Sequence, residues 1–419
     1  MLNAPSDSGL RFRCVVHRNG HYLIRKNYLA FYSTSINLKA VAFAIYFCCH
    51  PFSGWAANEP EKIREIVDTS IRPLMAEHGV PGMAVAVTVN GEAFFFNYGV
   101  ASREKNTPIS EKTLFELGSI SKTFTATLAS YAQALGKLSF NDNPGQYLPE
   151  LKGSAIDKAT LLNLGTYTAG GLPLQFPDEV SNDQMMGYFQ QWKPDAAPGR
   201  QRRYSNPSIG LLGYITGLAL KSDFADAMES QLFPQLGLEG SYVRVPDIAM
   251  ENYAWGYDKE NRPVRGNPGV FAAQAYGVKS STADMIRYVQ ANIEPSRLRG
   301  PARQAVESTH VGYFKSGAMV QGLGWERYPY PITLKRLLNG NSYDMILDPN
   351  PATQLPVPLA GSRRTLFNKT GSMDGFGNYV AFVPEKRIGV VILANKNYPI
   401  PARITAAHAI LERLAPMAR

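Results

Sequence analysis

A serine and a lysine three residues apart could form a nucleophile and its base. Ser119 and Lys122 lie in the segment 115–124, Phe-Glu-Leu-Gly-Ser-Ile-Ser-Lys-Thr-Phe. Residues at this spacing share one face of a helix, so Lys122 would stand beside the Ser119 hydroxyl. Serine is a weak nucleophile until a neighbouring base takes its proton, and a lysine made neutral by burial and nearby cations can be that base. By itself the pair fits equally well a serine in the first turn of a core helix.

The residues after Gly118 predict the helix that would position this pair. An apolar stripe with spacings of four, three and four residues follows, and it consists of Phe124, Leu128, Tyr131 and Leu135. Gly136 marks the end of the helix. The same serine–lysine spacing occurs at 102–105, but it lies in a polar turn after a predicted strand, so we interpret it as chance.

Strand patterns occur at both ends of the chain. Residues 83–89 and 92–98 predict two strands joined by an Asn-Gly hairpin turn, and residues 378–383 and 388–394 predict two more. Helices are predicted at 63–75 and from Pro401 to about Leu414. Strand signals are sparse between Gly136 and about Val270, and the Pro- and Asn-rich segment 337–364 is typical of a long irregular loop.

This order predicts two lobes with a cleft between them. An α/β lobe would comprise about 57–115 and 275–419, and a helical lobe about 116–274. The chain has 419 residues, enough for one large core or two domains, with 45% hydrophobic and 18% charged residues. We expect one catalytic domain, 57–419, and nothing in the sequence indicates more than a monomer.

The formal charge of +9 does not indicate a nucleic-acid partner. Residues 1–57 hold six basic side chains and one acidic side chain, so five of the nine charges lie there. No basic stripe interleaved with aromatic residues follows. The six histidines are scattered, which argues against a histidine-based metal site and against a serine–histidine triad. We therefore expect no metal and no cofactor.

The N-terminus resembles an export signal. Lys39 precedes ten mostly apolar residues, 40–49, and small residues follow up to a cleavage site after Ala56. Ten residues are too few to span a bilayer as a helix, which needs about 20. Residues 1–56 would thus be an extension and signal peptide that is removed, and translation would start near Leu38. We expect a periplasmic protein without a stable membrane anchor, and without cysteine, because all three cysteines precede the cut.

Two further fragments strengthen the catalytic interpretation. Tyr204-Ser205-Asn206 follows a Gly- and Arg-rich loop, and Lys369-Thr370-Gly371 precedes a predicted strand pair. Alone, the first fits a capped turn and the second an ordinary edge strand. A given tripeptide is expected well under once in a chain of this length. Their order after Ser119-x-x-Lys122 is therefore difficult to attribute to chance.

The three fragments together resemble those of serine β-lactamases and penicillin-binding proteins, and the Tyr-x-Asn form is similar to class C β-lactamases. The similarity extends across almost all of the mature chain, through the segments 79–86, 115–124, 168–175, 274–279 and 393–399. It implies a β-lactamase/transpeptidase-like fold, of the α/β plus all-α class. In that fold an antiparallel sheet is flanked by helices, a helical lobe adjoins it, and the active site lies in the cleft between.

The resemblance also implies roles for single residues. Ser119 would attack the lactam carbonyl, with the backbone N–H groups of Ser119 and Ser372 as the oxyanion hole. Tyr204 would carry protons, because the Lys122 and Lys369 ammonium groups would favour its phenolate. The base in each step would be either Tyr204 or Lys122. The implied substrate-binding residues are Gln175, Asn206, Tyr276, Thr370, Gly371 and Arg403, with Lys369 and Thr370 on the substrate carboxylate.

Some positions depart from the family pattern. Met373 and Asp374 stand where small residues are common, which predicts a bulkier, anionic edge to the site. Ile400 replaces a common Asn and Asn368 a common His, as in some cephamycin-hydrolysing members. The sequence thus predicts hydrolysis of β-lactams, mainly cephalosporins and also cephamycins. The alternatives are a D-Ala-D-Ala carboxypeptidase or esterase with the same acylation machinery, and a penicillin-sensing domain that stays acylated.

Overall fold

The computed structural model describes residues 59–266, 268–361 and 363–418. The described residues belong to one compact unit, Ala56–Arg419. The predicted extension and signal peptide, the start near Leu38, the cut after Ala56 and the three cysteines all lie outside the described residues. The exact boundaries of the two lobes also stay predictions.

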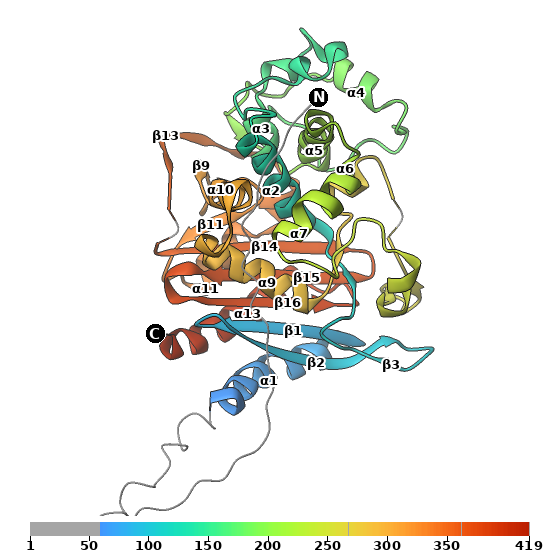
Figure 1. Ribbon diagram of the computed structural model, residues 1–419, viewed down its shortest axis with the longest axis vertical. Helices are drawn as coiled ribbons and strands as arrows, with labels where there is room; N and C mark the ends of the chain where they lie inside the picture. Colours follow the sequence, from blue (N-terminus) through green and yellow to red (C-terminus); the bar gives the residue numbers. More distant parts are fainter. Residues whose placement is uncertain (1–58, 267, 362, 419) are drawn as a thin grey trace, which may run out of the picture. The chain divides into compact units, whose positions relative to one another are not determined.

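A ten-stranded antiparallel sheet forms the centre of the described chain (Figure 1). Its spatial order is β13 (Thr353–Leu359), β9 (Gly312–Ser316), β10 (Met319–Gly322), β11 (Glu326–Pro329), β14 (Thr365–Met373), β15 (Phe376–Val383), β16 (Ile388–Ala394), β1 (Gly82–Val89), β2 (Glu92–Ser102) and β3 (Thr107–Pro108). The four strands predicted from sequence are β1, β2, β15 and β16. Asn90 and Gly91 join β1 to β2 with positive φ angles of 54° and 91°, as a tight hairpin turn requires.

The segment predicted as one long loop contains regular elements, so that prediction is wrong. Residues 337–364 include most of α11 (Leu334–Gly340), all of α12 (Tyr343–Leu347), β12 (Asn350–Pro351) and β13. Thr333 and Ser342 cap the two helices by accepting hydrogen bonds from the backbone. Strand β13 carries prolines at 356 and 358, which a strand tolerates at the edge of a sheet.

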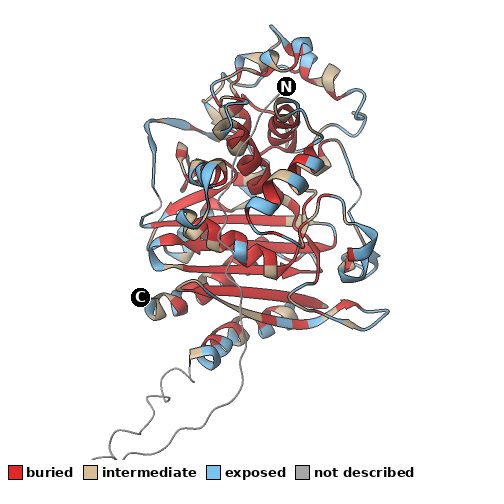
Figure 2. Cartoon of the chain, viewed as in Figure 1, coloured by how far each residue is buried: buried red, intermediate tan, exposed pale blue. Residues whose placement is uncertain are grey.

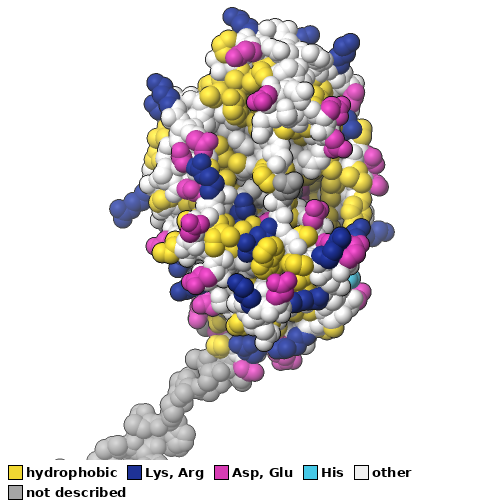
Figure 3. All heavy atoms as spheres, turned by 90° about the vertical axis from the view of Figure 1, so that its right-hand side faces the viewer, with side chains coloured by type: hydrophobic (Ala, Val, Ile, Leu, Met, Phe, Trp, Pro, Cys, Tyr) yellow, Lys and Arg dark blue, Asp and Glu magenta, His cyan; other side chains and the backbone are white. Residues whose placement is uncertain are grey.

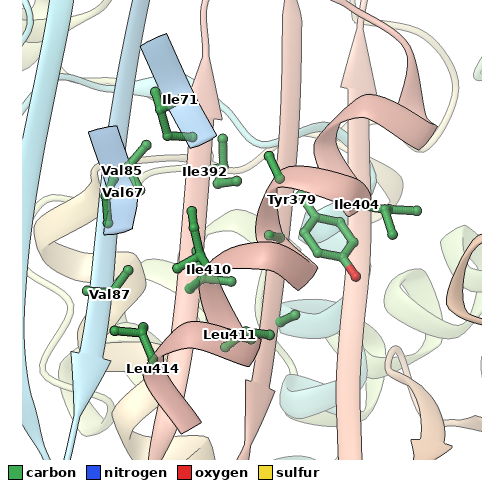
Figure 4. Close-up of a cluster of buried hydrophobic side chains, with 14 of the residues drawn as sticks. Val67, Ile71, Val85, Val87, Tyr379, Ile392, Ile404, Ile410, Leu411 and Leu414 are labelled. Atoms are coloured by element: carbon green, nitrogen blue, oxygen red, sulfur yellow. The ribbon is translucent and has the colours of Figure 1, made fainter. Parts of the chain in front are cut away.

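One face of the sheet packs against the helices from the two ends of the described chain. Helix α1 (Glu59–His78) and helix α13 (Ile400–Leu414) lie side by side against β1, β15 and β16. Figure 4 shows their side chains, among them Ile71, Ile410 and Leu414, directed at Val85 and Ile392 of the sheet. Burial of each such side chain typically contributes about 1.5–3 kcal/mol.

The opposite face is also covered, so the central strands are apolar on both sides. Alternate residues of β1, such as Ala84 and Ala86, pack in a second core with α9 (Thr282–Ile293) and with Phe124 of α2 (Ser121–Ala134). Strands β1, β15 and β16 are buried along their whole length. Figure 2 shows this burial, in red, along the central strands and along α2 and α5.

A third core joins α2 to the helices that follow it. These are α3 (Leu161–Gly165), α4 (Met185–Gln191) and α5 (Asn206–Leu220), which lie together beyond the sheet in Figure 1. The remaining helices are α6 (Phe224–Asp226), α7 (Phe233–Gln235), α8 (Ala272–Ala275) and α10 (Gly300–Thr309). Among the described residues between 136 and 270, the strands are all two residues long, namely β5 (Gln201–Arg202), β6 (Gly256–Tyr257) and β7 (Pro263–Val264), so strands are sparse there as predicted.

Candidate active site

Ser119 lies in a 3₁₀ turn, Gly118–Ile120, that leads directly into α2. Lys122 is in the first turn of α2 and is fully buried. Its Nζ atom donates to Ser119 Oγ at 2.9 Å and to the Ala275 carbonyl at 2.8 Å. The serine and lysine are therefore in direct contact, at the distance a nucleophile and its base require.

Tyr204 and Lys369 meet this pair. Tyr204 directly precedes Ser205, the residue that caps α5, and Lys369 lies in the middle of β14. The Nζ atoms of Lys122 and Lys369 lie 5.0 and 4.9 Å from the centroid of the Tyr204 ring. Among the described residues, the buried Tyr204 hydroxyl has no hydrogen-bond partner within ordinary geometry. A phenol thus stands between two ammonium groups.

These charges shift the pKa values in different directions. Burial raises the pKa of Tyr204, but the charges of Lys122 and Lys369 outweigh it and bring the pKa below its ordinary value. Burial lowers the pKa of Lys122 to about 8, despite the opposing effect of Tyr204. For Lys369 burial acts in the same way, but the Glu326 carboxylate outweighs it and raises the pKa. Of the two lysines, Lys122 is the one that loses its proton first.

Two charged residues that the sequence analysis missed surround Lys369. Glu326 Oε1 lies 3.3 Å from Lys369 Nζ and 3.8 Å from Arg202 Nη2, and all three side chains are almost fully buried. Asn368 Nδ2 donates to Glu326 Oε2 at 3.1 Å. Because Glu326 pairs with Asn368 across β11 and β14, only the sheet register brings it here. Its one local signal is a charged pair, Glu326-Arg327, inside an apolar segment.

The backbone of Ser372 lies against the turn that carries Ser119. A Cβ atom added to Gly118 would stand 2.7 Å from both the nitrogen and the oxygen of Ser372, closer than real Cβ contacts. Gly118 also has a φ of +56°, which favours glycine. This close approach brings the backbone of Ser372, at the end of β14, against the turn that carries Ser119.

A cavity of about 360 Å³ opens over these groups. Eight of the predicted residues line it: Ser119, Gln175, Tyr204, Asn206, Tyr276, Lys369, Thr370 and Ser372. Asn206 Nδ2 donates to Gln175 Oε1 at 2.9 Å, so these two amides form one polar wall. Met373, Asp374 and Ile400 also line the cavity, as expected for the departures from the family pattern.

Arg403 differs from its predicted place. It is fully buried and does not line the cavity. Its Nη1 atom donates to the Gly371 carbonyl at 2.7 Å and to Ser372 Oγ at 2.9 Å, and its other nitrogens contact Asn397 and Tyr398. The structure therefore places Arg403 against the β14 backbone at residues 371 and 372 rather than on the cavity wall.

Residues 59–266, 268–361 and 363–418 contain no group of three or more His, Cys, Asp or Glu side chains that could hold a metal ion. Within the same ranges no helix is long and apolar enough to cross a membrane.

Comparison with known proteins now adds to this geometry. A family model described as Beta-lactamase matches residues 67–415. The chain belongs to the β-lactamase family. A curated β-lactamase of Pseudomonas fluorescens is 54% identical over 353 residues, which cover 84% of this chain and 99% of that protein. A β-lactamase of Escherichia coli K12 is 43% identical over 357 residues, or 85% of this chain and 94% of that protein.

Solved structures extend the comparison to the class. A class C β-lactamase in complex with cefoxitin is 48% identical, with a TM-score of 0.82 over 84% of this chain and 99% of that one. A protein described as β-lactamase/D-alanine carboxypeptidase from Pseudomonas syringae is 49% identical, also with a TM-score of 0.82, over 84% and 98%. The predicted fold is confirmed, and the enzyme is a serine β-lactamase of class C, a hydrolase.

Proposed function

We propose that the enzyme hydrolyses β-lactams, mainly cephalosporins, through an acyl-enzyme on Ser119. The observation that carries this proposal is the 2.9 Å contact between Lys122 Nζ and Ser119 Oγ, with the Tyr204 ring beside it between Lys122 and Lys369. In acylation, Ser119 Oγ bonds to the lactam carbonyl carbon and the C–N bond breaks. The serine proton passes through Lys122 and Tyr204 to the leaving nitrogen. Water then cleaves the ester by the reverse proton path.

The division of labour between Lys122 and Tyr204 follows their shared titration. The pKa values of both groups are lowered, so each loses its proton more easily than it would in water. Groups this close exchange protons as one unit, so the cluster, rather than either residue, is the general base. Lys369, held protonated by Glu326, would stay a fixed cation.

The oxyanion hole in this proposal consists of the backbone N–H groups of Ser119 and Ser372. The tight packing of Gly118 on Ser372 supports it, because it leaves no room for either backbone to shift. Arg403 would hold the second donor in place through its bonds to Gly371 and Ser372. Removal of one such donor typically costs about 2.7–4 kcal/mol of transition-state stabilisation.

Substrate binding would use the two sides of the cavity. Asn206 and Gln175 would hydrogen-bond the amide of the acyl side chain, with Tyr276 as an aromatic wall. On the other side, Lys369 and Thr370 would hold the substrate carboxylate, and the Gly371 backbone lies between these groups and Ser372. All of these except Gly371 line the cavity.

Cephamycins would also be substrates. Ile400 and Asn368 support this extension, since the sequence resembles cephamycin-hydrolysing members at these positions. The similar class C enzyme with cefoxitin adds support. Turnover of cefoxitin and cephalothin should be compared directly, and no measurable cefoxitin hydrolysis would contradict the cephamycin proposal.

A second candidate function is D-alanine carboxypeptidase activity. Two structural neighbours carry that activity in their descriptions, one from Pseudomonas syringae and one from Burkholderia cenocepacia. The acylation machinery would be the same, with a peptide in place of the lactam. A penicillin-sensing domain, which acylates once, is the third possibility. We place the enzyme in the periplasm as a monomer, exported by the signal peptide within residues 1–56.

Intact-protein mass spectrometry during exposure to excess cephalosporin, with absorbance of the lactam, tests the proposal. We expect many turnovers, a transient adduct on the wild type, and no turnover by Ser119→Ala. Ser102→Ala is a matched control, because Ser102 belongs to the second serine–lysine pair and lies outside the cavity. A single persistent adduct with surviving drug would overturn hydrolysis in favour of a peptidase or sensor.

A further inference from the structure

A second cavity of about 240 Å³ adjoins the active-site cavity. Three residues line both cavities: Gly266, Tyr276 and Met373. Tyr276 is the proposed wall beside the acyl side chain of the substrate. A long acyl side chain would therefore be directed toward this second cavity rather than into solvent. Figure 3 shows a neighbouring face of the molecule, on which Lys and Arg side chains lie near the middle, among hydrophobic ones.

Two opposite charges face each other in this second cavity. Lys279 and Glu116 are directly paired across the short strands β8 (Lys279–Ser280) and β4 (Phe115–Glu116), and both line the cavity. Among the described residues, neither side chain makes an ion pair within 4.0 Å. Lys279 and Glu116 therefore lie side by side in the cavity without a direct ion pair between them.

Lys279 has unused hydrogen-bond donors. Among the described residues, its Nζ atom makes one hydrogen bond, to the Val243 carbonyl at 3.1 Å, although an ammonium group has three N–H donors. Partial burial lowers the pKa of Lys279, and the carboxylates of Glu116 and Glu229 partly oppose this. A partly buried ammonium with free donors is stabilised by an incoming carboxylate.

Glu116 is held rigidly and also has a free oxygen. Its Oε1 atom accepts from the Tyr253 hydroxyl at 2.5 Å and from the Gly266 backbone at 2.8 Å. Its Oε2 atom takes no hydrogen bond from the described residues, so it can accept one from an ammonium group. The other cation at the cavity, Arg244, is already paired with Asp223 and Asp226.

Gly266 keeps the wall between the two cavities thin. A Cβ atom at this position would stand 2.7 Å from Glu116 Oε2 and 2.7 Å from Met373 Cε. Any side chain here would therefore press on the Glu116 carboxylate and on the Met373 side chain that both cavities share. The absence of a side chain leaves this boundary open to a ligand that extends past Tyr276.

From this arrangement we propose that the second cavity binds β-lactams whose acyl side chain ends in an α-amino acid group. The terminal carboxylate would accept hydrogen bonds from Lys279 Nζ, and the terminal ammonium would donate to Glu116 Oε2. Neutral acyl chains gain neither contact, and a chain with only a carboxylate gains the first but meets Glu116. The inference rests on the proposed function, since it concerns the specificity of the same site.

The test compares three cephalosporins with acyl chains of equal length: D-α-aminoadipyl, adipyl and hexanoyl. For the wild type we expect kcat/KM for the aminoadipyl substrate to exceed that for the hexanoyl one by about tenfold or more, which is the lower range for bonds to charged groups. Adipyl should fall between them. Equal values for all three substrates would overturn the proposal.

Variants separate the site from the chemistry. Lys279→Met should reduce the aminoadipyl preference to near parity and leave hexanoyl turnover unchanged, whereas Lys279→Arg should retain the preference. Gly266→Val should also remove the preference with Lys279 intact. A preference that survives both Lys279→Met and Gly266→Val would overturn the inference. If the wild type does not hydrolyse the hexanoyl cephalosporin at all, the proposed function itself is refuted. Failure of the proposed function can therefore be distinguished from failure of this inference.

Discussion

Gly118→Ala should reduce catalysis far more than it reduces stability. Its new Cβ atom would stand 2.7 Å from the nitrogen and oxygen of Ser372 and 2.9 Å from its carbonyl carbon. These are backbone atoms, so no flexible side-chain end can move away. Either the turn that carries Ser119 or the end of β14 must shift, and the two N–H groups proposed as the oxyanion hole would then no longer converge on one point.

The magnitude follows from two separate effects. Loss of one oxyanion donor costs about 2.7–4 kcal/mol, so kcat should fall by about 10²–10³-fold. The positive φ of Gly118, +56°, should cost about 1 kcal/mol of folding free energy when alanine adopts it. The assay is kcat for cephalothin, with the free energy of unfolding from denaturant titration.

Gly136→Ala is the matched control for this prediction. Gly136 has a similar φ of +68°, but nothing lies within 4 Å of a Cβ atom there. Gly136→Ala should therefore lose about 1 kcal/mol of folding free energy from backbone strain at positive φ, as Gly118→Ala does, but its kcat should be unchanged. If Gly118→Ala keeps kcat within a few-fold of the wild type, the argument that this contact fixes the oxyanion hole is refuted.

Two further predictions concern buried charge. Burial lowers the pKa of His310 from 6.5 to about 3. Between pH 6.5 and pH 3 the unfolded chain therefore binds more protons than the folded one. The free energy of unfolding should fall as pH falls through this range, by up to about 1.4 kcal/mol per pH unit. The free energy of unfolding of His310→Gln, measured by denaturant titration, should fall less steeply between pH 6 and pH 4 than that of the wild type. Equal slopes for the two proteins would count against this prediction. Glu326→Gln removes the carboxylate that raises the pKa of Lys369, so the alkaline limb of kcat/KM should move to lower pH, and an unmoved limb would contradict the assignment.

The sequence predicted those parts of the fold whose signals are local. The hairpin at Asn90-Gly91 and the apolar stripe after Gly118 specify their own elements, because turn residues and periodicity act over a few positions. In the segment 337–364, the two prolines of β13 led to the prediction of a loop where the structure has a strand. Proline is rare in strands as a class, and only the position at the sheet edge makes it acceptable.

The candidate site followed the same distinction between local and long-range signals. The contact between Ser119 and Lys122 could be predicted from their spacing on one helix. Glu326, in contrast, lies beside Lys369 only because β11 pairs with β14. Arg403 was predicted to bind substrate. Sequence could not show that its guanidinium donates its hydrogen bonds to the Gly371 carbonyl, Ser372 and Tyr398.

The prolines at the sheet margins also bear on self-association. An exposed edge strand offers unpaired N–H and C=O groups on which a second molecule can add a strand. Here one margin is β13, with Pro356 and Pro358, and the other is β3, two residues long and ending in Pro108. Val357, 75% exposed between the two prolines, would otherwise favour such strand addition. Because proline has no backbone N–H, a second molecule cannot form a continuous ladder of hydrogen bonds along these edge strands. The sheet can therefore keep two open edges without favouring self-association at high protein concentration.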